Sequence, residues 1–91
     1  MTLVQQVGRL IGKYNPQAEQ AWLLHFRPVG GGDERAQINC FLRIELGSME
    51  QDTTALRECL IEDGTERDYL RHIERHVAPF VAQHGLPCWT K

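Results

Sequence analysis

The sequence lacks the features that mark membrane proteins and disulfide-rich secreted proteins. No apolar run approaches the roughly 20 residues that cross a bilayer. The N-terminal stretch 1–6 has no basic segment followed by an apolar one, so it does not read as a secretory signal. The three cysteines, Cys40, Cys59 and Cys88, are odd in number, widely spaced and without a CxxC pair. These absences predict a cytoplasmic protein with reduced thiols and no membrane association.

Positive charge is also too sparse for a nucleic-acid-binding protein. The chain has 10 basic and 12 acidic residues, a net charge of −2. Residues 45–68 hold eight acidic groups against two basic ones, which gives that stretch −6. Duplex and RNA binders normally present a basic stripe to the phosphates. We therefore expect no nucleic-acid partner, and the acidic stretch favours a basic protein partner.

What the sequence does contain fits one small globular domain. Its 91 residues are 42% hydrophobic and 24% charged, an ordinary globular balance. We predict a single α+β domain over residues 1–91, with a C-terminal tail at 85–91. In this prediction a small antiparallel sheet of two or three strands packs against one helix from each end of the chain.

The two terminal helices carry the clearest local signals. Residues 2–14 have apolar side chains at helical spacing, and Thr2 with Gln5 matches a capping box. Residues 65–84 begin at a good N-cap, Thr65, and stop at Gly85. Pro79 lies inside this second helix and is expected to kink it or restart it near residue 78.

Two segments between these helices read as strands of a hairpin. Residues 36–46 alternate, with apolar side chains at every even position, and residues 21–29 alternate less regularly. Gly30-Gly31-Gly32 then reads as a slack hairpin loop. Phe41 interrupts the polar face of the second strand, which indicates that something covers part of that face.

Residues 52–63 fit either a helix or a third strand. Their local pattern favours a helix, whereas a two-stranded hairpin alone is marginal and needs a third strand. The predicted order is therefore α-β-β-β-α or α-β-β-α-α. Double-stranded-RNA-binding domains share the first order. They bind phosphates with lysines at the start of the last helix, where this chain has Thr65-Glu66-Arg67-Asp68. RNA binding is therefore not expected.

Gly8 and Gly12 lie four residues apart beside the apolar stripe of the first helix. Their spacing indicates a close approach, either to the predicted sheet or to a helix of a second copy. Paired glycines at this spacing are mainly a membrane-helix motif, which favours contact within the chain.

Histidine spacing is the only feature that suggests a metal. His72 and His76 are four apart, so both rings project from one side of a helix, with His84 and Cys88 further along. We expect His84 at the edge of the core, and no HExxH motif is present. The primary prediction is no metal and no cofactor. The alternative is a metal- or ligand-binding module that uses His72, His76, His84 and Cys88.

No arrangement of residues indicates catalysis, so the chain is predicted to be non-enzymatic. The expected function is a protein–protein interaction domain, such as an adaptor, an inhibitor or an accessory subunit, binding a protein partner or a second copy of itself. A dimer would pair the hairpins edge to edge. Trp89 either folds back onto the core or contacts a partner. The candidate partner-binding residues are Trp89, Leu86, Phe41, Glu58 and Glu62.

Overall fold

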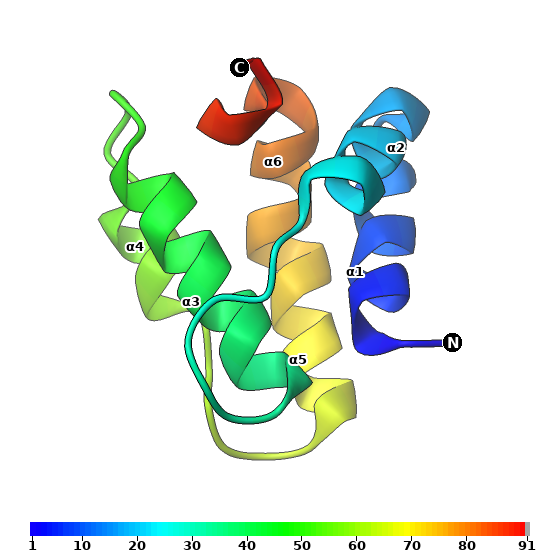
Figure 1. The fold of residues 1–91 in the computed structure, drawn as a ribbon, viewed down its shortest axis with the longest axis vertical. Coiled ribbons are helices and arrows are strands. Elements are labelled where there is room, and N and C mark those ends of the chain that lie inside the picture. The colour runs from blue at the N-terminus through cyan, green and yellow to red at the C-terminus, as the bar shows by residue number, and fades with distance from the viewer. Residues whose placement is uncertain (91) are drawn as a thin grey trace.

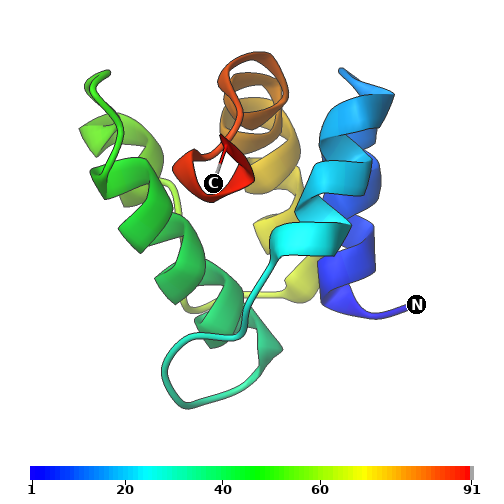
Figure 2. The same ribbon diagram turned by 45° about the horizontal axis from the view of Figure 1, so that its top comes forward.

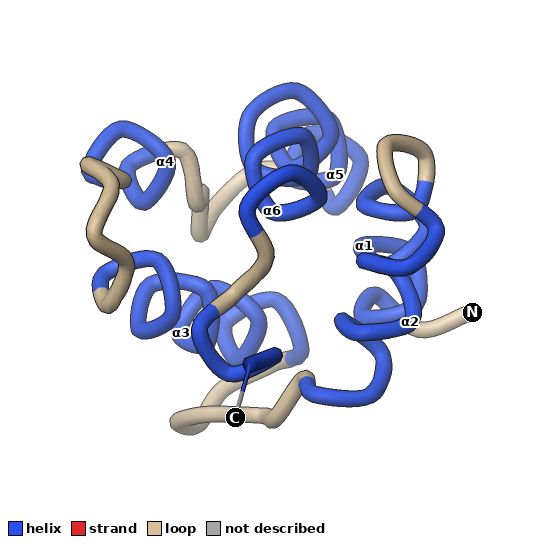
Figure 3. The backbone as a smooth tube through the Cα atoms, turned by 90° about the horizontal axis from the view of Figure 1, so that it is seen from above, coloured by secondary structure: helices blue, strands red, loops and turns tan. Residues whose placement is uncertain are grey.

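The computed structural model describes residues 1–90, and over that range it is helical, with no strand (Figure 3). The elements are α1 (Leu3–Gly12), α2 (Pro16–His25), α3 (Glu34–Gly47), α4 (Thr54–Glu58), α5 (Glu66–His72), the π-helical turn η1 (Ile73–Val77), α6 (Ala78–His84) and the 3₁₀ turn η2 (Pro87–Thr90). The predicted α+β class, with its antiparallel sheet, is therefore wrong.

The segment that reads most clearly as a strand, residues 36–46, is most of α3. Its buried side chains are Ile38, Phe41, Leu42 and Leu46, together with the polar Asn39. Spacings of three and four place these residues on one side of a helix. Phe41, which disrupted the alternating pattern, is the residue that completes the helical one. Asp33 caps the helix, because its carboxylate accepts from the backbone N–H of Ala36 at 2.9 Å.

The second predicted strand, residues 21–29, is the end of α2 and the connection to α3. Asn15 caps α2 and Pro16 occupies its first turn, so the Asn15-Pro16 pair that ends the first helix also begins the next. Trp22 is fully buried and its indole N–H donates to the carbonyl of Val4 at 2.9 Å. Gly30-Gly31-Gly32 is part of a helix–helix connection and not of a hairpin turn.

The predictions for the two terminal helices are confirmed. Thr2 and Gln5 form the expected capping box at the start of α1. Thr65 caps α5 by accepting from the backbone N–H of Asp68 at 3.0 Å, and α6 ends at Gly85 with φ +74°. A π-turn precedes Pro79: the N–H of Ala78 bonds the carbonyl of Ile73, five residues back.

Residues 52–63 are neither a third strand nor a full helix. Only Thr54–Glu58 are helical, and α4 buries none of its side chains. The chain then continues without regular structure to α5. We call residues 60–64 the linker.

Gly8 and Gly12 face α2 and not a sheet. A Cβ atom on Gly8 would lie 3.0 Å from the indole of Trp22, and the nearest atoms to one on Gly12 belong to Glu19. The glycines therefore serve the close packing of α1 against α2 within the chain.

The helices pack in three groups. α1 and α2 form an antiparallel pair on one side of the long α5–η1–α6 helix, and α3 with α4 lies on the other side (Figure 1). The C-terminal turn η2 sits between α2 and α3 (Figure 2). Among residues 1–90, no helix is both long enough and apolar enough to span a bilayer.

Candidate partner-binding site at the acidic end

The predicted contact residues separate into buried and exposed sets. Leu86 and Phe41 are buried in the core. Trp89 is half-buried and packs back onto the core, with its ring beside Gly85. Glu58 at the end of α4 and Glu62 in the linker are exposed. Of the five candidates, only the two glutamates lie fully on the surface.

The histidines are not brought together as metal ligands. The His72 and His76 rings stack with centroids 5.9 Å apart, as their spacing predicted. His84 is exposed, and its ring centroid lies 4.3 Å from that of Phe80, a half-buried residue that packs against the core. Across residues 1–90 no three side chains of His, Cys, Asp or Glu form a group that could hold a metal ion.

A polar ladder on α3 holds the linker. Arg35, Asn39 and Arg43 are spaced by four, so they project from one side of the helix. All three donate to main-chain carbonyls. Arg35 reaches Asp63 at 3.1 Å, Gly64 at 3.2 Å and Glu62 at 3.4 Å; Asn39 reaches Ile61 at 2.9 Å; Arg43 reaches Leu60 at 3.0 Å. Every carbonyl of the linker therefore accepts from α3.

Two buried polar atoms beside this ladder have no hydrogen-bond partner among the described residues. They are Oδ1 of Asn39 and the hydroxyl of Tyr69. The guanidinium of Arg35 lies 5.4 Å from the centre of the Tyr69 ring. Burial raises the pKa of Tyr69 well above its usual value, and the positive charges of Arg35 and Arg43 only partly oppose that rise. The phenol therefore stays protonated at neutral pH.

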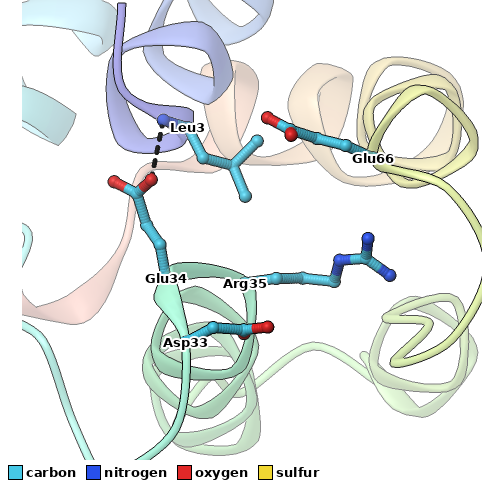
Figure 4. Close-up of a pocket in the computed structure, with 5 residues that line it drawn as sticks. All are labelled: Leu3, Asp33, Glu34, Arg35 and Glu66. Carbon is cyan, nitrogen blue, oxygen red and sulfur yellow. Dashed lines mark hydrogen bonds between the residues drawn. The ribbon is translucent and has the colours of Figure 1, made fainter.

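Four carboxylates and Arg35 line two cavities at the start of α3. A cavity of about 170 Å³ is lined by Leu3, Asp33, Glu34, Arg35 and Glu66 (Figure 4). A second cavity, of about 320 Å³, is lined by Gly32, Asp33, Arg35, Ala36, Asn39 and Glu62. We call the four carboxylates Asp33, Glu34, Glu62 and Glu66 the acidic end.

The charges at the acidic end are only partly neutralised. Glu34 accepts from the backbone N–H of Leu3 at 2.9 Å, which ties α3 to the start of α1. Glu62 forms an ion pair with Arg43 at 3.1 Å, but both side chains are well exposed, so the pair is weak. Arg35 directs its guanidinium N–H groups to the linker carbonyls. Counting both arginines, four carboxylates face two cations, which leaves a net charge of −2.

Sequence reasoning found only Glu62 of this group. Asp33, Glu34 and Glu66 belong to two helix starts that meet only in the folded chain. The spacing of Arg35, Asn39 and Arg43 was visible, but it carries meaning only on a helix, and residues 36–46 were read as a strand.

Comparison with protein-family models, with curated proteins and with solved structures finds no match to the chain.

Proposed function

We propose that this chain is a non-enzymatic protein–protein interaction domain whose acidic end binds a basic segment of a partner protein. The observation that carries the proposal is that Asp33, Glu34, Glu62 and Glu66 line two cavities that share Asp33 and Arg35, and that the Arg35 guanidinium already donates to main-chain carbonyls. A cytoplasmic location, expected from the odd and widely spaced cysteines, belongs to this proposal.

Electrostatic complementarity supports a basic partner. A surface with a net negative charge steers positively charged segments toward it, and it repels acidic ones. The linker adds to this negative surface. Its carbonyls accept hydrogen bonds from α3, and its Glu62 and Asp63 side chains are exposed. An edge-to-edge dimer is not part of the proposal, since it required a sheet.

The test uses a fluorescein-labelled peptide with three arginines separated by Gly-Ser spacers, and an equivalent peptide with three glutamates. Fluorescence anisotropy should show binding of the arginine peptide alone. The affinity should fall as salt rises from 20 to 300 mM, because exposed charges are screened over about 8–10 Å at physiological ionic strength.

The matched variants change the same number of carboxylates at two places. Glu62→Gln with Glu66→Gln removes half of the acidic end and should weaken binding by roughly tenfold. Glu50→Gln with Glu58→Gln removes two exposed carboxylates that line neither cavity, and it should change binding little. Equal losses in the two double variants would show binding to net charge alone and would overturn the assignment of the acidic end.

A further inference from the structure

We propose that a groove between α1 and α5 binds an acidic, amphipathic helix of a protein partner. The groove has a volume of about 550 Å³ and is lined by Met1, Gln6, Arg9, Leu10, Lys13 and Leu70. We call it the α1–α5 groove. This inference goes beyond the proposed function, because it concerns a different surface and a partner segment of the opposite charge.

The α1–α5 groove follows from the way the first helix packs. α1 lies closely against η1 and α6 but makes fewer close contacts with α5. Two polar bridges cross between the helices: the amide of Gln6 donates to Glu66 at 3.5 Å, and the ammonium of Lys13 bonds to Glu74 at 2.6 Å. Positions 6 and 13 are about 10 Å apart along a helix, so the groove extends over about two helical turns.

The floor of the groove between these bridges is apolar. Leu10 comes from α1 and Leu70 from α5, and both are half-buried side chains that pack against the core. An apolar side chain of a partner placed between them would remove their remaining exposed surface from water, which favours binding. A groove two turns long accommodates side chains spaced by four residues on one face of a partner helix.

Charge complementarity favours an acidic segment in this groove. Arg9 and Lys13 line it, and no carboxylate does. Arg9 is exposed and has no ion-pair partner among residues 1–90. The carboxylates of Glu66 and Glu74 accept from Gln6 and Lys13, and α1 itself contains no acidic residue. The acidic side chains of a bound helix would therefore lie toward α1, beside the unpaired guanidinium.

The recessed floor favours a protein segment over a membrane surface. A peripheral helix binds a bilayer by inserting apolar side chains that protrude from its surface. Leu10 and Leu70 are instead half-buried between two helices, and Met1 is the one groove residue whose large apolar side chain is well exposed. A recessed floor receives side chains that protrude from a partner, as in other grooves that bind amphipathic helices.

The test uses a fluorescein-labelled helical peptide with leucines at positions i, i+4 and i+7 and glutamates beside them. A scrambled peptide of the same composition has no apolar face and is the control. Fluorescence anisotropy should show that the amphipathic peptide binds at least roughly tenfold more tightly than the scrambled one. Its affinity should fall as the salt concentration rises, because the flanking charges are exposed.

Charge reversal tests the cationic side of the groove. Arg9→Glu reverses the unpaired cation and should weaken binding of the amphipathic peptide by roughly tenfold. Arg75→Glu, in η1, is the matched control, because Arg75 is also exposed but does not line the groove. It should change binding little. Equal losses in the two variants would show binding to net charge alone and would overturn the assignment of the groove.

A second pair of variants tests the apolar floor. Leu10→Gln keeps the size of the side chain and removes its apolar character, so it should weaken peptide binding by roughly fivefold. Leu24→Gln, at a 71% exposed position of α2, should leave binding unchanged. Circular dichroism and thermal unfolding establish that the variants are folded. Arg9 is exposed, so Arg9→Glu tests the groove even if Leu10→Gln lowers stability.

The remaining outcomes separate this inference from its alternatives. If the scrambled peptide binds as tightly as the amphipathic one, the apolar floor is not used and the inference is wrong. It is also wrong if the amphipathic peptide fails to bind while vesicles of phosphatidylcholine and phosphatidylserine bind the wild type but not Arg9→Glu, because the groove then faces a membrane. Arg9→Glu should not weaken binding of the three-arginine peptide, so failure here leaves the proposed function of the acidic end unaffected.

Discussion

α3 contacts two neighbouring segments, α2 and the linker, through different kinds of interaction. Toward α2 it uses aromatic packing: Phe41 meets both Trp22 and Phe26 edge to face, with ring centroids 5.7 and 5.1 Å away. Toward the linker it uses side-chain hydrogen bonds to carbonyls, from Arg35, Asn39 and Arg43, and the exposed ion pair of Arg43 with Glu62. The first contact removes apolar surface from water, and the second mainly exchanges hydrogen bonds with water for hydrogen bonds within the chain.

This difference separates the part of the molecule that contributes most to the stability of the fold from the part that we propose binds a partner. Burying an aromatic side chain stabilises the fold by several times as much as one hydrogen bond does. The net contribution of one hydrogen bond is about 1 kcal/mol. We therefore expect the linker to open more readily than α2 detaches. A surface held by modest contacts can adapt to a partner, which agrees with the acidic end lying along the linker.

The largest expected effect is at the aromatic contact. Trp22→Ala removes a fully buried side chain and its bond to the Val4 carbonyl, and should lower the free energy of unfolding by about 3–5 kcal/mol. Leu24→Ala, on the same helix but 71% exposed, should change it by less than about 0.5 kcal/mol. Urea denaturation followed by circular dichroism measures both. Similar losses in the two variants would contradict the packing described for α2.

A smaller effect is expected at the polar ladder. Asn39→Ala leaves the Ile61 carbonyl without its donor and should cost about 1–3 kcal/mol. Hydrogen exchange should accelerate at the linker amides while those of α1 and α2 stay protected. A loss of protection spread evenly over all helices would show that the linker and the core unfold as one unit.

The cap of α5 should contribute less again. Thr65→Ala removes the acceptor for the Asp68 N–H and should cost about 1 kcal/mol at pH 7. Hydrogen bonding to Thr65 holds the pKa of Asp68 below its usual value, so this interaction stabilises the fold above the ordinary pKa of about 4. It is lost as the pH falls through the lowered pKa. The difference between wild type and variant should therefore shrink in acid, as stability measured from pH 7 to pH 3 would show.

The smallest effect, opposite in sign, is expected at Tyr69. Tyr69→Phe removes a buried hydroxyl that has no partner, and should raise the free energy of unfolding by up to about 1 kcal/mol. Because burial raises the pKa of this phenol, the wild type is stabilised below its ordinary pKa of about 10 and loses that stabilisation as the pH rises further. The variant lacks this dependence. Denaturation at pH 8 and pH 10.5 compares the two, and a destabilised Tyr69→Phe would reveal a partner for the hydroxyl.

The parts of the fold that sequence reasoning predicted are those encoded locally. Thr2 with Gln5, Thr65 and Gly85 act on backbone groups within a few residues of themselves, so their patterns identify helix ends directly. The sheet was wrong because alternation at residues 36–46 contains the helical spacing Ile38, Leu42 and Leu46 as well. Phe41 and Asn39 decide between these readings through contacts with α2 and the linker, which are distant in sequence. The acidic end was foreseen only through Glu62 for the same reason.

Because of the π-turn, the packing of the last helix depends on how many residues the helix contains. Tyr69, Ile73, Val77 and Val81 are all buried and are separated by exact steps of four. In a regular α-helix each such step overshoots one turn by about 40°, so the row would wind away from the core. The wider turn at η1 takes up part of that excess. Deleting Arg75 would remove one exposed side chain, yet it would also put Tyr69 and Val81 out of phase. Between Tyr69 and Val81, the packing therefore constrains the number of residues as well as the identity of the buried side chains.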